Sequence, residues 1–208
     1  MSRIIILVGS VRKGGNTDLL AHAFAESAGK RHDVELVSVA DYAVHPCIGC
    51  NSCYISEGHR CFQDDDMQQI YDKLKQADML VIASPVYFYG ISAQLKAVID
   101  RLHTPMRNDF HIRKLGLILV GAAELPDLFD PIILQYRMLI SVSVWRISEW
   151  SWCPAQKTKG MSSVSLLSES AAGSLSASLP HSPCSRFHRY NIPWSSRQAG
   201  SRFLPRIS

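Results

Sequence analysis

The sequence lacks the features that would place it in a membrane or outside the cell. It has no run of about 18 apolar residues, so no membrane-spanning helix is expected. Its first residues are strand-like and show no basic region and no cleavage site, so no secretory signal is expected. These absences predict a cytoplasmic protein, in which cysteines are metal ligands or free thiols rather than disulfides.

Two common nucleotide-binding motifs are also missing. No G-x-G-x-x-G occurs, which excludes the dinucleotide fingerprint. A Walker A loop is excluded as well, because Gly9 and Gly14 are followed by Gly15 and Asn16 instead of Lys and Ser or Thr. A bound nucleotide would therefore need another kind of loop.

Such a loop follows the first apolar run, which covers residues 4–8 and predicts a buried strand. Apolar residues at helical spacing begin at Leu19, so residues 9–17 form the turn into a helix. Glycines let the backbone approach a ligand, and a helix N-terminus attracts anions. Polar and basic side chains in this turn favour a phosphate over a plain capped turn, namely Ser10, Arg12, Asn16 and Thr17.

Buried strands alternate with helices along residues 1–138. Period-two alternation at 33–39 and apolar runs at 78–83 and 114–120 predict three more strands, and residues 67–74, 91–103 and 130–139 have helical patterns. This alternation predicts an α/β fold with a doubly wound parallel sheet. The loops at 9–17, 84–90 and 121–124 would share the carboxyl edge, where such sheets bind ligands. Consecutive aromatics at 87–89 cannot all point inward, so a flat apolar ring with a phosphate tail would suit this edge.

Four cysteines lie in one loop with the spacing C-x2-C-x2-C-x7-C: Cys47, Cys50, Cys53 and Cys61. Four converging thiolates suit a [4Fe–4S] cluster. Zinc is less natural, because structural zinc sites use paired C-x2-C knuckles, and free thiols are the remaining alternative. Cys153 and Cys184 match no pattern.

These motifs occur together in one order. Gly9-Ser10-x-Arg12 and Gly15-Asn16-Thr17 precede the cysteine loop, and Asp65-Asp66-Met67, Ser84-Pro85-Val86-Tyr87-Phe88 and Leu95-Lys96-x-x-x-Asp100-Arg101 follow it. Over residues 1 to about 138, the series resembles the flavodoxin-like NAD(P)H-dependent FMN reductases, and specifically their iron–sulfur flavoprotein branch. The resemblance implies bound FMN, a five-stranded sheet and a homodimer or homotetramer.

The resemblance also implies roles for residues of this chain. Ser10, Arg12, Asn16 and Thr17 would hold the FMN phosphate. The isoalloxazine would lie along the loop formed by Pro85, Val86, Tyr87, Phe88, Tyr89 and Gly90. Gly121 and Ala122, at the end of the next strand, would form the third side of the site. NAD(P)H would reduce the flavin, which would pass electrons to a small acceptor or, through a [4Fe–4S] cluster, to a redox partner. No catalytic acid–base residue, nucleic acid or membrane is expected.

The pattern changes near residue 139. Residues 139–208 hold 18 serines against 8 before them, with 8 basic and only 2 acidic residues. This composition predicts a second region, residues 139–208, in which the family's fifth strand and last helix are expected to be missing or disrupted. A frameshift near residue 140 would change composition and periodicity together, whereas a disordered basic tail is the alternative.

Three other functions stay open beside the reductase. A non-enzymatic flavodoxin-type electron carrier would share the fold, although such carriers are strongly acidic. An inactive truncated product would not retain FMN. A serine- and arginine-rich interaction protein would bind anionic polymers in a salt-sensitive way.

Overall fold

The computed structural model describes residues 1–122, 125, 127–142, 149–156 and 188–191. Its centre is one sheet with the strand order β2-β1-β3-β4-β5-β6. The first five strands are parallel, and β6 is antiparallel to β5. The strands are β1 (Arg3–Val8), β2 (Asp33–Ser38), β3 (Met79–Pro85), β4 (Lys114–Gly121), β5 (Glu149–Gln156) and β6 (His188–Asn191).

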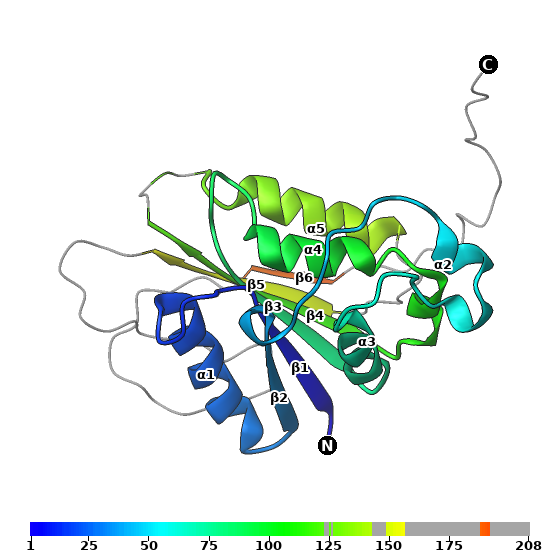
Figure 1. The fold of residues 1–208 in the computed structure, drawn as a ribbon. Helices are drawn as coiled ribbons and strands as arrows, with labels where there is room; N and C mark the ends of the chain where they lie inside the picture. Colours follow the sequence, from blue (N-terminus) through cyan, green and yellow to red (C-terminus); the bar gives the residue numbers. More distant parts are fainter. Residues whose placement is uncertain (123–124, 126, 143–148, 157–187, 192–208) are drawn as a thin grey trace.

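Helices cover both faces of this sheet (Figure 1). One face packs against α1, whereas α3, α4 and α5 lie over the other. The helices are α1 (Asn16–Gly29), α2 (Ser52–Ile55), α3 (Met67–Lys75), α4 (Ala93–Arg101) and α5 (Asp130–Val142), with short 3₁₀ turns η1 (Val39–Asp41), η2 (Glu57–His59) and η3 (Pro105–Asp109). The predicted α/β, doubly wound parallel fold is confirmed.

Burial on both faces explains why β1, β3 and β4 are nearly continuous apolar runs. In β1, Ile5 and Leu7 join the core under α3, α4 and α5, whereas Ile4 and Ile6 join the core under α1. All seven residues of β3 are buried. A strand of a parallel sheet needs apolar side chains in both directions, so a short unbroken run is the expected pattern.

The structure describes a fifth strand, β5, in a region whose sequence pattern predicted none, and the disruption of the family's own fifth strand stays a prediction. Residues 149–156, where no strand was expected, pair with β4 in parallel over its full length, from Glu149 opposite Lys114 to Gln156 opposite Gly121. The backbone of β4 offers its free edge to any extended segment, so pairing here does not require an apolar run. The pairing of β5 with β6 ends at Trp152, before Pro154. Because Pro154 lies outside this pairing, its missing N–H costs no hydrogen bond to β6.

The remaining expectations for residues 139–208 are not settled by these elements. The expected loss of the last helix, and most of the proposed tail, fall on residues outside the described ranges. The frameshift concerns the nucleotide sequence and stays a prediction, as does the division at residue 138. Among the described residues, no helix is both long and apolar enough to cross a bilayer.

Candidate functional site

The loop between β1 and α1 lies at the carboxyl edge of the sheet (Figure 1). Gly9 continues β1 and donates its N–H to the Ala83 carbonyl at 2.7 Å. A Cβ at Gly9 would lie 2.7 Å from Leu95 Cδ2 and 2.9 Å from Leu95 Cβ, so only glycine fits between β1 and α4. This close approach fixes the start of the loop against the next strand and helix.

The predicted phosphate residues surround the N-terminus of α1. Ser10 and Thr17 are buried, Asn16 is half-buried and Arg12 is exposed. Ser10 Oγ accepts the Arg12 N–H at 3.2 Å, and the Arg12 Nε lies where a Cβ on Gly15 would be only 3.6 Å away. Arg12 therefore lies beside the first turn of the helix.

The N-terminus of α1 has no side-chain cap. The N-cap residue is Gly15, and within the described part of the chain no side chain accepts a cap hydrogen bond there. Asp18 accepts the Gly14 N–H at 2.7 Å, so that one N–H is taken and one carboxylate opposes an anion. The N–H groups of the first turn, together with the helix dipole and Arg12, still leave a site with the donors that a phosphate needs.

The aromatic loop after β3 is a strained tight turn. Tyr87 and Gly90 exchange two backbone hydrogen bonds of 2.9 and 3.0 Å. Phe88 and Tyr89 between them have φ of 48° and 63°, the pattern of a type I′ turn, which normally carries Asn and Gly. Phe88 is fully exposed, and Tyr87 and Tyr89 are about half exposed. Backbone strain that presents apolar rings to solvent is typical of a ligand-binding position.

Two buried serines, for which the sequence predicted no role in the site, join the two loops. Ser92 caps α4 by accepting the Leu95 N–H, and its hydroxyl donates to the Gly9 carbonyl at 2.6 Å. Ser84 at the end of β3 accepts the Ser92 N–H at 3.1 Å. A serine directly before a helical pattern is a known capping signal, which could have identified Ser92. The serines hold the phosphate loop and the aromatic loop at a fixed separation.

The third predicted side of the site is the end of β4. Val120 accepts the N–H of Val86 at 2.8 Å, so this strand end lies beside the aromatic loop. Gly121 is buried, and a Cβ there would lie 2.3 Å from Leu128 Cδ2, whereas Ala122 is exposed. The structure thus brings the three predicted loops to one edge, with Pro85 buried, Val86 and Gly90 half-buried and the aromatics outward.

The four cysteines lie elsewhere. They belong to residues 43–66, here called the cysteine segment, which carries α2 at the end of α4 opposite the phosphate loop (Figure 1). Between Ser92 and Arg101, α4 advances about 14 Å at 1.5 Å per residue. The cysteine segment therefore contacts the C-terminal end of α4 through Arg101, whereas the phosphate loop contacts Ser92 at the N-terminal end.

Each of these cysteines is a free thiol, and all four line one cavity of about 720 Å³. Ser52 lowers the pKa of Cys50, because its hydroxyl lies 3.2 Å from Sγ. Within the described residues, no three His, Cys, Asp or Glu side chains converge on one point in a metal-binding arrangement. The donor set fits an iron–sulfur group, but the thiols must move closer together to ligate it.

A buried ion pair anchors the cysteine segment. Arg101 at the end of α4 donates to both carboxylate oxygens of Asp65, at 2.6 and 3.2 Å, and both side chains are almost fully buried. Burial pushes the Asp65 pKa upward, but hydrogen bonds from Arg101 and from the His45 and Met67 N–H groups outweigh it and lower the pKa. Tyr71 donates to the Arg101 carbonyl, and its burial raises its pKa to about 12.

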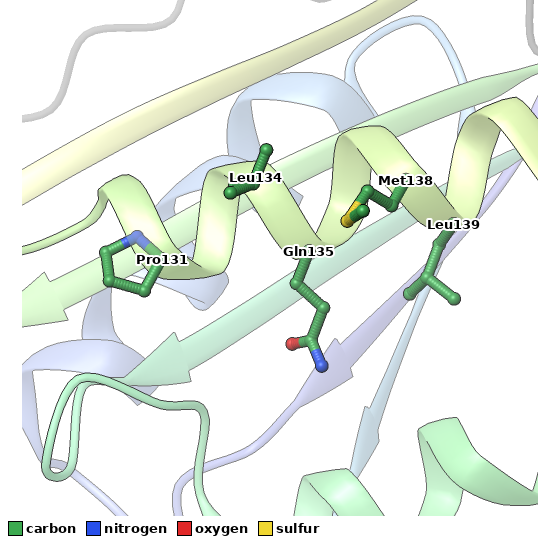
Figure 2. Close-up of a pocket in the computed structure, with 5 residues that line it drawn as sticks. All are labelled: Pro131, Leu134, Gln135, Met138 and Leu139. Atoms are coloured by element: carbon green, nitrogen blue, oxygen red, sulfur yellow. The ribbon is translucent and has the colours of Figure 1, made fainter.

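A shallow hollow lies on α5 and shares Gln135 and Leu139 with the cysteine cavity (Figure 2). Its volume is about 340 Å³, and it is lined by Pro131, Leu134, Gln135, Met138 and Leu139. Three of these side chains are exposed apolar groups, Leu134, Met138 and Leu139. With one amide and no charged group, the hollow offers none of the donors that the strand-end loops provide.

The fold defines a flavodoxin-like α/β protein, and its three strand-end loops form the candidate ligand site. Residues 2–125 match the family described as NADPH-dependent FMN reductase. Because the match covers more than half of the chain, the chain belongs to this family.

Individual relatives agree with this assignment. An iron–sulfur flavoprotein of Methanocaldococcus jannaschii is 42% identical over 125 residues, which are 59% of this chain and 63% of the relative. A putative NAD(P)H-dependent FMN-containing oxidoreductase of Bacillus subtilis is 33% identical, over 65% of this chain and 75% of its own. The match thus spans less than two thirds of the length of the iron–sulfur flavoprotein.

A solved structure supports the fold. The NAD(P)H:quinone oxidoreductase from Methanothermobacter marburgensis aligns with a TM-score of 0.61 over 78% of this chain and 90% of its own. The two sequences are 14% identical, so the likeness concerns the fold alone.

Proposed function

We propose that this chain is an NAD(P)H-dependent oxidoreductase that binds FMN at the carboxyl edge of the sheet. The observation that carries the proposal is the pairing of the uncapped α1 N-terminus with the strained aromatic turn, held together through Ser92. A phosphate fits the first feature and a flat ring fits the second. Family membership independently supports FMN.

Each loop would contribute a different part of the binding. Ser10, Asn16, Thr17 and Arg12 would hold the phosphate, and residues 85–90 with Gly121 and Ala122 would border the ring. Bound FMN supplies hydride and single-electron chemistry, so the protein needs only to position it and to exclude competing reactions. No general acid or base is assigned.

The cysteine segment would supply the route to a one-electron partner. We propose that Cys47, Cys50, Cys53 and Cys61 hold a [4Fe–4S] cluster. Its support is the four free thiols on one cavity together with the name of the Methanocaldococcus jannaschii relative. A small acceptor and a redox protein are both compatible with this arrangement.

The first test is the absorption spectrum of the full chain purified without oxygen. Flavin bands that NADPH or NADH bleaches are expected, with an added broad shoulder if the cluster is present. Flavin bands that neither nucleotide bleaches would favour the flavodoxin-type carrier. A colourless protein that does not bind added FMN would contradict the proposal.

A charge reversal locates the phosphate site. We expect Arg12→Glu to weaken FMN binding but not riboflavin binding, because riboflavin lacks the phosphate. Lys30→Glu makes the same charge change at the other end of α1 and should leave both affinities unchanged. Equal losses of FMN and riboflavin in Arg12→Glu would show that the phosphate lies elsewhere.

A further inference from the structure

The cysteine segment is closed at its base by a short ladder of hydrogen bonds. Ala43 donates its N–H to the Asp66 carboxylate at 2.8 Å and accepts the Asp66 N–H at 3.0 Å. His45 donates its N–H to the Asp65 carboxylate at 2.9 Å. These contacts bring the two ends of the segment together, so all four cysteines lie within one closed loop. We call residues 43, 45, 65 and 66 the neck.

Arg101 connects both sides of the neck, residues 43 and 45 on one side and 65 and 66 on the other, to α4. Its guanidinium donates to both Asp65 oxygens and, at 3.1 Å, to the His45 carbonyl. The side chain of Arg101 is 3% exposed and that of Asp65 1%, so water does not screen this pair. Other side-chain links from the segment to the region after α4 are long, at 3.4 Å from Tyr54 to His103 and 3.5 Å from Thr104 to His59.

The buried Nε–H of Arg101 has no hydrogen-bond partner among the residues that the structure describes, whereas both terminal nitrogens are engaged. A buried donor left unpaired costs about 1–3 kcal/mol, so its persistence calls for an explanation. Arg101 lines the same cavity as the four cysteines, where a thiolate or sulfide sulfur would accept this hydrogen bond.

The part of the segment beyond the neck has the backbone freedom to close. Four of its residues, Gly49, Asn51, Gly58 and His59, have left-handed φ between 56° and 67°. Glycine crosses between backbone regions at little cost, so Gly49 and Gly58 suit points of rearrangement. A fixed neck with an adjustable tip is the arrangement that would let separated thiols gather around metal ions.

From these contacts we infer that Arg101 is a positioning residue for the cysteine site. It fixes the neck so that the four thiols close together on an iron–sulfur group, and its Nε–H donates to a sulfur of that group. Each thiol loses its proton to solvent when its sulfur binds iron. The inference rests on the cluster half of the proposed function, and it assigns Arg101 a role apart from the flavin.

The test compares Arg101→Gln and Arg101→Lys with the parent chain. Lysine keeps the charge but lacks the forked geometry that reaches both Asp65 oxygens and the His45 carbonyl. Lys96→Gln is the matched control, because Lys96 lies on the same helix and the same cavity but pairs with exposed Asp100. Each FMN-loaded full chain is incubated without oxygen with sulfide and equal amounts of ferrous and ferric iron, which together supply the oxidation state of a [4Fe–4S] cluster. Bound iron is measured as a function of the iron concentration.

We expect both Arg101 variants to bind iron about tenfold more weakly than the parent and Lys96→Gln, in line with the loss of an outer-shell partner. FMN affinity should be unchanged in every variant. The Arg101 variants should also change the reduction potential of whatever cluster still forms, because hydrogen bonds to sulfur tune it. Arg101 variants that keep FMN, take up iron like the parent and keep its potential would overturn the inference.

Two further outcomes are separable. If the parent binds FMN but no iron, both the cluster and this inference are wrong, while the flavin half of the proposed function stands. If the Arg101 variants do not fold, amide hydrogen exchange of the parent chain tests whether the neck is fixed before iron binds. The neck amides of His45 and Asp66 should be protected before iron is added, and the tip amides only afterwards. Neck amides that exchange as fast as the tip in the iron-free chain would overturn the inference.

Discussion

The aromatic turn can be tested sharply, because a substitution that relieves its backbone strain should stabilise the fold and weaken FMN binding. Replacing Phe88 by Asn and Tyr89 by Gly would give the sequence that a type I′ turn prefers. A left-handed non-glycine residue costs about 1–2 kcal/mol. The new Gly loses about 0.5–1 kcal/mol through the entropy of the unfolded chain, and the exposed edge-on contact between the two rings is lost. The net gain should be about 1 kcal/mol.

The assay is urea unfolding of the FMN-free double variant. With a slope of about 2 kcal/mol/M, the midpoint should rise by about 0.5 M. Phe62→Asn is the control, because Phe62 is also a largely exposed phenylalanine but lies outside the left-handed region. FMN binding, followed by flavin fluorescence, should weaken in the double variant and not in the control. A midpoint at or below that of the parent would refute the strain argument.

Three further changes test the contacts around the two sites. Asp65→Asn should destabilise the chain by about 3–5 kcal/mol at pH 7, because it leaves Arg101 buried and unpaired. The folded pKa of Asp65 is lowered, so its stabilisation is present above the unfolded value of about 3.9 and is lost as the pH falls through the folded value. The gap between variant and parent should therefore narrow below about pH 4 in urea titrations, and a constant gap would contradict this. Gly9→Ala should cost about 1–3 kcal/mol in urea unfolding, because its Cβ would meet the Cβ of Leu95, which cannot rotate away. Ser92→Ala should lower stability by about 1–2 kcal/mol through loss of the α4 cap and should also weaken FMN binding; a change in neither would show that this serine does not join the loops.

The sequence predicts β1, β3 and β4 well because each is buried on both faces, and it predicts the edge strand β2 from its period-two alternation. The run at 114–120 corresponds to Lys114–Gly121, and the run at 78–83 to Met79–Pro85. In a parallel sheet, burial on both sides produces a local signal that needs no knowledge of neighbours. The edge at which the three loops meet follows from chain direction alone, so the grouping of those loops could also be predicted.

The contacts that shape the sites could not be predicted in the same way. Asp65 and Arg101 are 36 residues apart, and each reads locally as an ordinary helix-terminal charge. Their pairing appears only once α4 and the cysteine segment are placed together. Likewise, the strain at Phe88 and Tyr89 is invisible in a sequence that lacks the usual Asn-Gly signal. Convergence of the cysteines is a question of side-chain placement, which spacing alone does not determine.

The fifth strand shows the limit most clearly. Its segment reads Glu-Trp-Ser-Trp-Cys-Pro-Ala-Gln, with neither a long apolar run nor a clean alternation. Yet β4 requires a neighbour, because an open edge beside a buried central strand exposes a row of unpaired backbone groups. Backbone pairing of this kind depends little on side chains, so the position is filled by a segment whose own pattern does not predict a strand. The presence of β5 therefore says little about whether residues 139–208 retain the family's sequence, and the nucleotide sequence read in its other frames is the direct measurement of that.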